Sequence, residues 1–262
     1  MKRMYSSIVL LGVVMLSGCV YVGQPLNKPN PMQAAMTRNQ IGMEYLRMGD
    51  IQKAQVEFES ASRLSPNLAE TYNGLGLALA AQGDNERADA NFRKAIRISG
   101  DTSGQFHNDY GTFLYHQKNF EAACTQFMAA TNDSLYANRA AAYENLGLCQ
   151  EQRHALPLAK DAFFHALRLS ANMPVSNLEL AEVFYDLGDM EHAQLGYGQY
   201  VRLMRHQPQS ARGLWLGWRL AHARHDTAAM ASTSLALQNL YPQSQEFFEY
   251  QKFSRHVPPT NP

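Results

Sequence analysis

The chain has 262 residues, 45% of them hydrophobic, and its 23 basic side chains balance 23 acidic ones to a formal net charge of +0. This length suffices for one or two globular domains or for one extended array of repeats. A neutral chain gives no electrostatic reason to expect a nucleic-acid partner, and its 3 cysteines are too few for a disulfide-dense scaffold.

The first 18 residues have the pattern of a bacterial secretory signal. Lys2 and Arg3 precede an apolar stretch at 8–16 that is too short to span a membrane as a helix. The sequence Leu-Ser-Gly-Cys at 16–19 resembles the lipobox of bacterial lipoproteins. That resemblance implies cleavage before Cys19, acylation of this cysteine, for example with palmitate, and, with Val at position 20, transfer to the outer membrane. An ordinary cleavage site that ends in cysteine is the alternative.

Residues 19–34 are predicted to form an extended tether behind the lipidated cysteine. Pro25, Pro29 and Pro31 interrupt this stretch, which shows no apolar periodicity. Several acyl chains on one residue anchor a protein stably without a spanning helix, and the tether would hold the folded part off the bilayer.

The stretch 39–66 shows a pattern that the rest of the chain repeats. Its small, aromatic, turn and proline positions match the tetratricopeptide repeat, a helix-turn-helix unit of about 34 residues; they are Ile41, Gly42, Tyr45, Gly49, Asp50, Ala54, Phe58, Ala61 and Pro66. Small residues let two antiparallel helices approach closely, and the aromatic side chains fill the space between them. Gly49 is predicted to end the first helix and Asp50 to cap the second.

The same template predicts six units, at 35–68, 69–102, 104–137, 140–173, 174–207 and 210–243. The turn of the fourth unit, 153–155, lacks glycine, so we expect an irregular helix end there. The sixth unit is degenerate, as a terminal unit facing water should be. Residues 244–262 complete the chain as a capping helix and a frayed tail. The predicted fold is all-α, a right-handed superhelical solenoid of about six tetratricopeptide units.

No catalytic constellation stands out in the sequence. Asn73 to Gly76 is a poor match to a glycine-rich phosphate loop, because it opens a repeat helix with no strand before it. His222 and His225 lie three apart, but no third metal ligand follows at a suggestive spacing. Trp215 and Trp218 are expected to pack the end of the solenoid. We therefore expect no enzyme activity, cofactor, metal ion or small-molecule substrate.

Cys124 and Cys149 are predicted to form a disulfide. The register puts Cys124 near the start of the second helix of unit three and Cys149 in the middle of the first helix of unit four. These two helices are packing neighbours in a solenoid. Once Cys19 is lipidated, two thiols face an oxidising compartment. Two buried free thiols are the alternative.

A partner-binding groove is predicted on the concave face, which the first helix of each unit lines. Helical spacing places these side chains there: Met36, Asn39, Met43, Leu46, Arg47, Asn73, Leu77, Asn108 and Tyr115. Asn39, Asn73 and Asn108 take the same place in successive units and form a ladder of amides that suits a peptide backbone. Apolar side chains grouped in a groove need a partner to cover them. The alternative is that asparagine is merely tolerated on a solvated face.

Four stretches together resemble the type IV pilus biogenesis and stability lipoproteins, the tetratricopeptide class of pilotin: LSGC (16–19), NQIGMEYLRMGD (39–50), HNDYGTFL (107–114) with the downstream cysteines, and RGLWLGWRLA (212–221) followed by LYP (240–242). The resemblance covers the whole chain. It implies a non-enzymatic lipoprotein of the outer membrane, facing the periplasm, that binds the secretin of the pilus machine, carries it to the outer membrane and promotes assembly of its ring. The alternative is a scaffold lipoprotein of another envelope machine, for β-barrel assembly or cell-wall synthesis.

Overall fold

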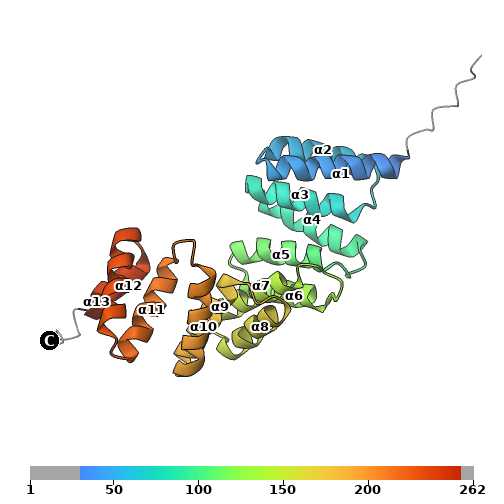
Figure 1. Cartoon of the computed structure of the whole chain (residues 1–262). Helices are drawn as coiled ribbons and strands as arrows, with labels where there is room; N and C mark the ends of the chain where they lie inside the picture. Colours follow the sequence, from blue (N-terminus) through green and yellow to red (C-terminus); the bar gives the residue numbers. More distant parts are fainter. Residues whose placement is uncertain (1–29, 255–262) are drawn as a thin grey trace, which may run out of the picture.

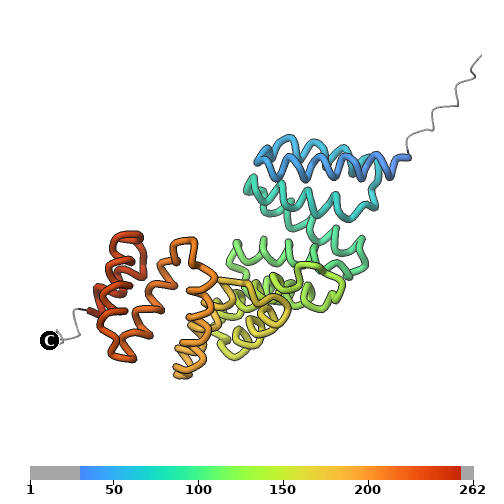
Figure 2. Tube along the Cα trace, viewed as in Figure 1, coloured from blue at the N-terminus to red at the C-terminus, as the bar shows by residue number. Residues whose placement is uncertain are grey.

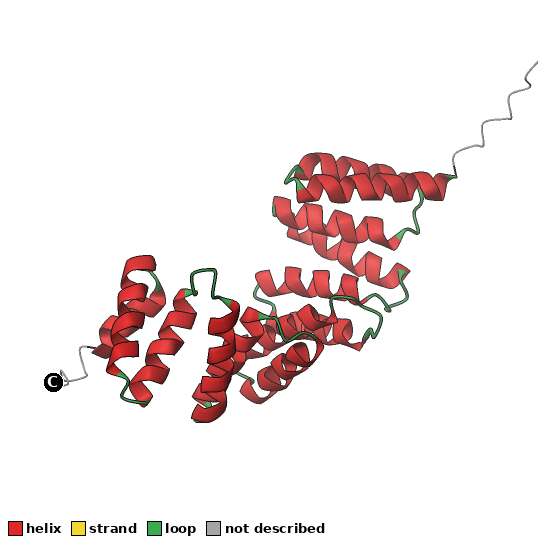
Figure 3. Ribbon diagram, in the orientation of Figure 1, coloured by secondary structure: helices red, strands yellow, loops and turns green. Residues whose placement is uncertain are grey.

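The computed structural model describes residues 30–254, and this part of the chain contains helices and no strand (Figures 1 and 3). The helices are α1 (Pro31–Arg47), α2 (Ile51–Leu64), α3 (Ala69–Gln82), α4 (Asn85–Ile98), α5 (Gly104–His116), α6 (Phe120–Asn132), α7 (Arg139–Gln152), α8 (Leu156–Leu169), α9 (Pro174–Asp186), α10 (Met190–Leu203), α11 (Ala211–Ala223), α12 (Thr227–Leu240) and α13 (Gln245–Ser254). Consecutive helices pair as hairpins, and the hairpins stack into an arc (Figure 2). The predicted all-α solenoid is confirmed.

The two helices of each hairpin occupy different sides of the arc. Neighbouring first helices (α1, α3, α5, α7, α9 and α11) contact one another, whereas no second helix (α2, α4, α6, α8, α10 and α12) contacts another in the described part of the chain. The first helices therefore crowd together on the shorter, concave side. We call them the inner helices and the second helices the outer helices.

Glycine and phenylalanine make one contact that recurs through the core of the first four units. One glycine on the inner helix of each of these units lies against the phenylalanine sixteen residues later, in the pairs Gly42 and Phe58, Gly76 and Phe92, Gly111 and Phe127, and Gly147 and Phe163. A Cβ atom at Gly111 would lie 2.8 Å from the Phe127 ring, closer than packed atoms approach. Glycine is therefore what lets the two helices of these hairpins close on a large aromatic side chain.

The six turns inside the hairpins share one backbone conformation. Their left-handed residue is glycine at three turns, with φ of 77° at Gly49, 82° at Gly83 and 79° at Gly188. In unit four His154 takes the same conformation, with φ of 57°, and the Ala155 amide donates to the Gln150 carbonyl at 2.9 Å. The prediction of an irregular helix end at 153–155 is therefore wrong. Histidine can adopt this left-handed conformation at only a moderate cost in strain.

The junction between units two and three is more open than its neighbours. Gly100 and Asp101 both have positive φ, 70° and 63°, in the loop where the register gains one residue. A cleft of about 520 Å³ is lined by residues of α4, α5 and α6 at this point. His107 lies buried at the cleft, with its Nε2 atom 3.1 Å from Asp101 and its Nδ1 atom 2.8 Å from Gln126. The extra loop residue thus widens the stack locally without interrupting it.

Helix α1 begins earlier than the sequence indicated. Asn30 caps it by accepting a hydrogen bond from the Met32 amide at 3.0 Å, and Pro31 occupies its first turn. The predicted tether of 19–34 is therefore wrong for its last four residues, because proline fits a first helical turn whose amides lack partners. The signal at 1–18, Cys19 with the rest of the tether, and the end of the tail lie outside the described residues. Between residues 30 and 254, no helix is long and apolar enough to cross a membrane.

Helix α13 closes the C-terminal end of the stack. Trp218 on α11 lies 5.4 Å from the Trp215 ring, 5.5 Å from Tyr250 and 5.4 Å from Phe253, measured between ring centroids. Phe247 is buried with Leu214 and Leu237 beneath this aromatic group. Both tryptophans therefore pack the end of the solenoid, as the sequence indicated.

Candidate partner-binding face

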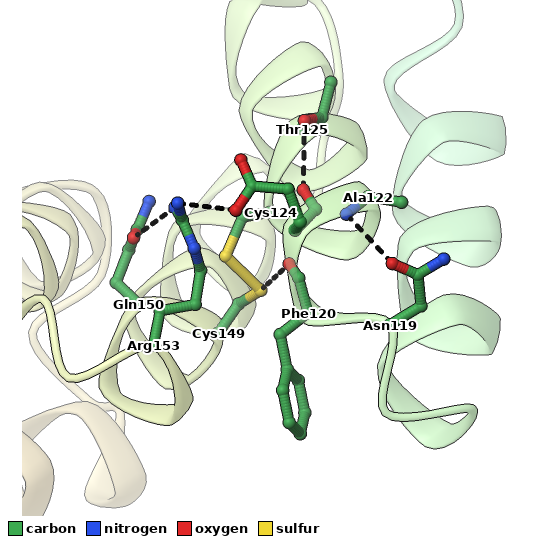
Figure 4. The surroundings of a disulfide bond; sticks show 9 residues. Asn119, Phe120, Ala122, Cys124, Thr125, Cys149, Gln150 and Arg153 are labelled. Carbon is green, nitrogen blue, oxygen red and sulfur yellow. Dashed lines mark hydrogen bonds and ion pairs between the residues drawn. A yellow bond between two sulfur atoms is a disulfide. The ribbon is translucent and has the colours of Figure 1, made fainter.

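The two internal cysteines meet where α6 of unit three packs on α7 of unit four (Figure 4). The Cα atoms of Cys124 and Cys149 lie 5.6 Å apart, within the range of disulfides, and their sulfur atoms are at bonding distance, 2.22 Å. Both side chains are buried. The predicted pairing is therefore sterically available, and it would join the two halves of the arc.

The predicted groove residues all lie on the inner helices α1, α3 and α5. Met36 is exposed, whereas Met43, Leu46, Leu77 and Tyr115 are half-buried and pack partly on the core. Exposed Arg47 also lies on α1, where it pairs with the neighbouring Glu44. These apolar side chains thus spread along one side of the first three units, and their covering by a partner stays a prediction.

The asparagines do not form the open ladder that the sequence indicated. Asn73 is only 2% exposed, and its amide nitrogen donates to Asp109 on the next inner helix at 2.7 Å. Asn108 accepts from Asn145, also on the next inner helix, at 2.9 Å, and Asn39 is half-buried. The prediction is wrong for Asn73 because inner helices approach closely enough for side chains to bond across, rather than out of, the concave face.

Polar contacts of this kind continue along the concave side. Ser176 on α9 donates to Glu144 on α7 through its amide, at 2.9 Å, and through its hydroxyl, at 2.6 Å. Arg212 on α11 then bonds Glu182 on α9 at 2.5 Å. Each neighbouring pair of inner helices from α3 to α11 is therefore joined by at least one polar side-chain bond.

A group of carboxylates lies on the inner helices of the last three units. We call it the carboxylate cluster; it comprises Glu144 and Glu151 on α7 and Glu179, Glu182 and Asp186 on α9. Arg212 lies 2.6 Å from Glu179 and 3.7 Å from Glu151. Arg219 lies two turns further along α11, where it bonds Glu182 and lies 3.8 Å from Asp186. Four of the five acidic side chains thus share two guanidinium groups.

Burial dominates the electrostatics of this cluster. It raises the pKa of Glu179 to about 8 and that of Glu151 to about 7, although Arg212 opposes both shifts. Burial and the charge of Glu182 also raise the pKa of Asp186. The carboxylates themselves hold the pKa of Arg212 above its usual value, against the burial that lowers it. For both glutamates the effect of burial is therefore larger than the attraction of Arg212.

Sequence reasoning missed the carboxylate cluster, although a signal was present. Glu144 and Glu151, Glu179 and Asp186, and Arg212 and Arg219 are each seven residues apart. A spacing of seven returns to the same face of a helix after two turns, and all three pairs lie in predicted first helices. Comparing these equivalent faces between units would have brought the charges together.

Other chemistry that the sequence suggested has a structural explanation. Gly74 and Gly76 lie inside α3, where Cβ atoms would meet the rings of Phe58 and Phe92, so they serve packing. His222 stacks on Trp218 with ring centroids 5.2 Å apart. Among residues 30–254, no three histidine, cysteine or acidic side chains are grouped to hold a metal ion.

Comparisons with known proteins give the family. Models described as tetratricopeptide repeat match residues 37–68 and 68–109. The type IV pilus assembly protein PilF of Pseudomonas aeruginosa is 33% identical over 253 residues, which cover 94% of this chain and 97% of PilF. The chain belongs to the PilF family of type IV pilus assembly proteins.

Solved structures of this family have the same arrangement of helices. The structure of Pseudomonas aeruginosa PilF is 33% identical in sequence. The match covers 85% of this chain and 99% of the PilF chain, with a TM-score of 0.79. The structure of PilW, described as a widely conserved type IV pilus biogenesis factor, is 25% identical and matches 84% of this chain and 99% of its own, with a TM-score of 0.71. The likeness to PilF family members therefore extends over nearly the whole stack, including the inner helices.

Proposed function

We propose that this protein is a pilotin, an outer-membrane lipoprotein that binds the secretin of the type IV pilus machine, brings it to the outer membrane and promotes its assembly into multimers. The observation that carries this proposal is the similarity to PilF along 97% of that protein, which supports a role in pilus biogenesis. The signal and the Leu-Ser-Gly-Cys stretch at 16–19 support anchoring through Cys19 on the periplasmic side of the outer membrane. The protein acts as a scaffold and catalyses no reaction.

The inner helices of the first units are the proposed secretin contact. Met36 is 42% exposed on α1, and Met43 and Leu46 stand half-buried on the same helix. Methionine side chains are flexible and polarisable, so they adapt to an apolar face presented by a partner. An amphipathic segment of the secretin laid along α1 and α3 would remove these side chains from water.

Deleting the gene is the first test. Without the protein, secretin subunits should lose their assembly factor, so heat-resistant secretin multimers should disappear from gels and pili from the cell surface. A Cys19→Ser variant should have the same defect because it removes the proposed lipid anchor. Unchanged multimers in the deletion strain would refute the pilotin assignment, and co-purification of a different envelope machine would identify the other partner.

A Met36→Glu substitution tests the contact itself. A charge at this exposed position should weaken secretin binding by about tenfold, because it places a carboxylate in an apolar interface, while leaving the melting temperature nearly unchanged. Val56→Glu, on the outer helix α2 at an exposed position, is the matched control. Pull-down of the secretin by the purified variants gives the measurement, and equal binding by both variants would place the contact elsewhere. Asn73→Asp is unsuitable for this purpose, because it would set a second carboxylate against Asp109.

A further inference from the structure

The concave side holds a small apolar pocket between units three and four. Its volume is about 200 Å³, and its lining comes from Thr112, Tyr115 and His116 on α5, Phe127 on α6, and Asn145 and Leu148 on α7. An engineered protein cavity of about 150 Å³ holds a benzene ring. The pocket therefore has room for one bulky aliphatic or aromatic side chain entering between two inner helices.

The carboxylate cluster begins next to this pocket. Glu151 follows Leu148 by three residues on α7, so the two side chains are neighbours on the helix surface. Tyr115 connects the two regions: it lines the pocket, and the charges of Glu151 and Glu179 add to burial in raising the pKa of its hydroxyl. An extended segment in the groove would pass from the pocket to the carboxylates within one turn of α7.

Glu151 is a mostly buried carboxylate of the cluster that no cation approaches closely. Its side chain is only 11% exposed, and the nearest guanidinium, that of Arg212, is 3.7 Å away. Arg212 is already engaged by Glu179 at 2.6 Å and by Glu182 at 2.5 Å. No side chain in the described part of the chain donates a hydrogen bond to Glu151. A further cation would complete this arrangement.

We propose that the pocket and Glu151 form a docking site for a protein segment in which a bulky apolar residue lies within four positions of a lysine or arginine. The apolar side chain fills the pocket, and the basic side chain bonds Glu151. Charge complementarity selects this occupant, because four carboxylates share two guanidinium groups beside the pocket. The site rests on the proposed function only in taking the concave face as the side that binds partners, and it lies two units away from Met36.

A selection from random peptides tests this site independently of the secretin. A phage library of random 12-residue peptides is panned against the full-length mature lipoprotein in detergent micelles, and in parallel against a Thr112→Leu/Glu151→Gln double variant. Leucine at position 112 fills the pocket, and glutamine at 151 removes the charge. The expected result is enrichment, on the natural protein alone, of peptides with a bulky apolar residue and a lysine or arginine within four positions.

Binding of the most enriched peptide by each single variant then separates the two contacts. Thr112→Leu and Glu151→Gln should each weaken binding about tenfold, and only the natural protein and Thr112→Leu should lose further affinity as salt is raised. Glu86→Gln, an equal change of charge on the outer helix α4, should bind as the natural protein does. Circular dichroism verifies that each variant keeps its helicity.

Two results would overturn the docking site. One is enrichment of the same peptides on the double variant, or no enrichment on either protein; the other is selection of acidic peptides. If the secretin assays fail but the peptide selection succeeds, the proposed function is rejected and the docking site is retained. The reverse pattern would keep the pilotin assignment and reject the site.

Discussion

The concave side of the molecule changes its chemistry along the arc while its core stays the same. In units one and two the inner helices carry methionine, leucine and a buried amide, Asn73, that bonds one neighbour. In units four to six they carry the carboxylate cluster with Arg212 and Arg219. Glycine against phenylalanine closes the hairpins of the first four units alike. The same packing contact thus recurs in the core, whereas the proposed partner contacts would depend on the side chains that each unit places on its inner helix.

The two regions also differ in what a partner would have to supply. For the apolar side chains in units one and two, covering by any complementary apolar surface makes the free energy of binding more favourable. The proposed site at the carboxylate cluster would discriminate more strongly, because a buried charge without a partner is costly and a basic side chain relieves that cost. The concave side could therefore combine two contacts: one in units one and two that accepts many apolar surfaces, and one at the carboxylate cluster that selects a basic side chain.

Removing the cysteine pair between these regions should have the largest effect on stability. In the Cys124→Ala/Cys149→Ala variant, loss of a crosslink over a sequence separation of 25 should lower the free energy of unfolding by about 3 kcal/mol. Denaturation of the natural protein with and without reductant gives the same comparison without a substitution. If both thiols of the unfolded natural protein react with an alkylating reagent before reduction, the disulfide prediction is refuted.

Replacing an arginine in each region sharpens the contrast between them. Arg212→Met should destabilise the protein by about 2 kcal/mol, because Glu179 would remain buried without its ion-pair partner and Glu182 would keep only Arg219. Arg47→Met, which removes the exposed pair with Glu44, should change the free energy of unfolding by less than about 0.5 kcal/mol. Urea denaturation of both variants makes the comparison. Equal losses would show that the cluster is a surface network like that on α1.

Sequence reasoning succeeded where each residue acts within its own hairpin. The spacing of Gly42 and Phe58, repeated in later units, predicts helices, turns and the pairs that pack, because these contacts span sixteen residues of one unit. It failed for Asn73 and for the carboxylate cluster. Their roles depend on how closely neighbouring inner helices approach, and that distance follows from the stacking of whole units rather than from any local pattern. The conformation of His154 was missed for a different reason, since its strain is small enough for the surrounding helices to impose.

The carboxylate cluster should also make the free energy of unfolding depend on pH. The pKa of Glu179 rises from 4.5 to about 8 on folding and that of Glu151 to about 7. Between these limits the folded state binds more protons than the unfolded state, so the cluster's contribution to the free energy of unfolding decreases as pH rises from about 5 to about 8.

A Glu179→Gln substitution isolates this contribution. Because it removes one of the two titrating groups, the difference in the free energy of unfolding between pH 5.5 and pH 8 should shift toward higher relative stability at pH 8. Comparison with the natural protein cancels the titration of the histidines, which both proteins share. Glu86→Gln on α4 should leave the difference unchanged, since the pH dependence originates in buried carboxylates. If both substitutions changed this pH difference equally, the carboxylates of the folded cluster would be hydrated rather than buried. The argument that Glu151 selects a basic side chain would then fail.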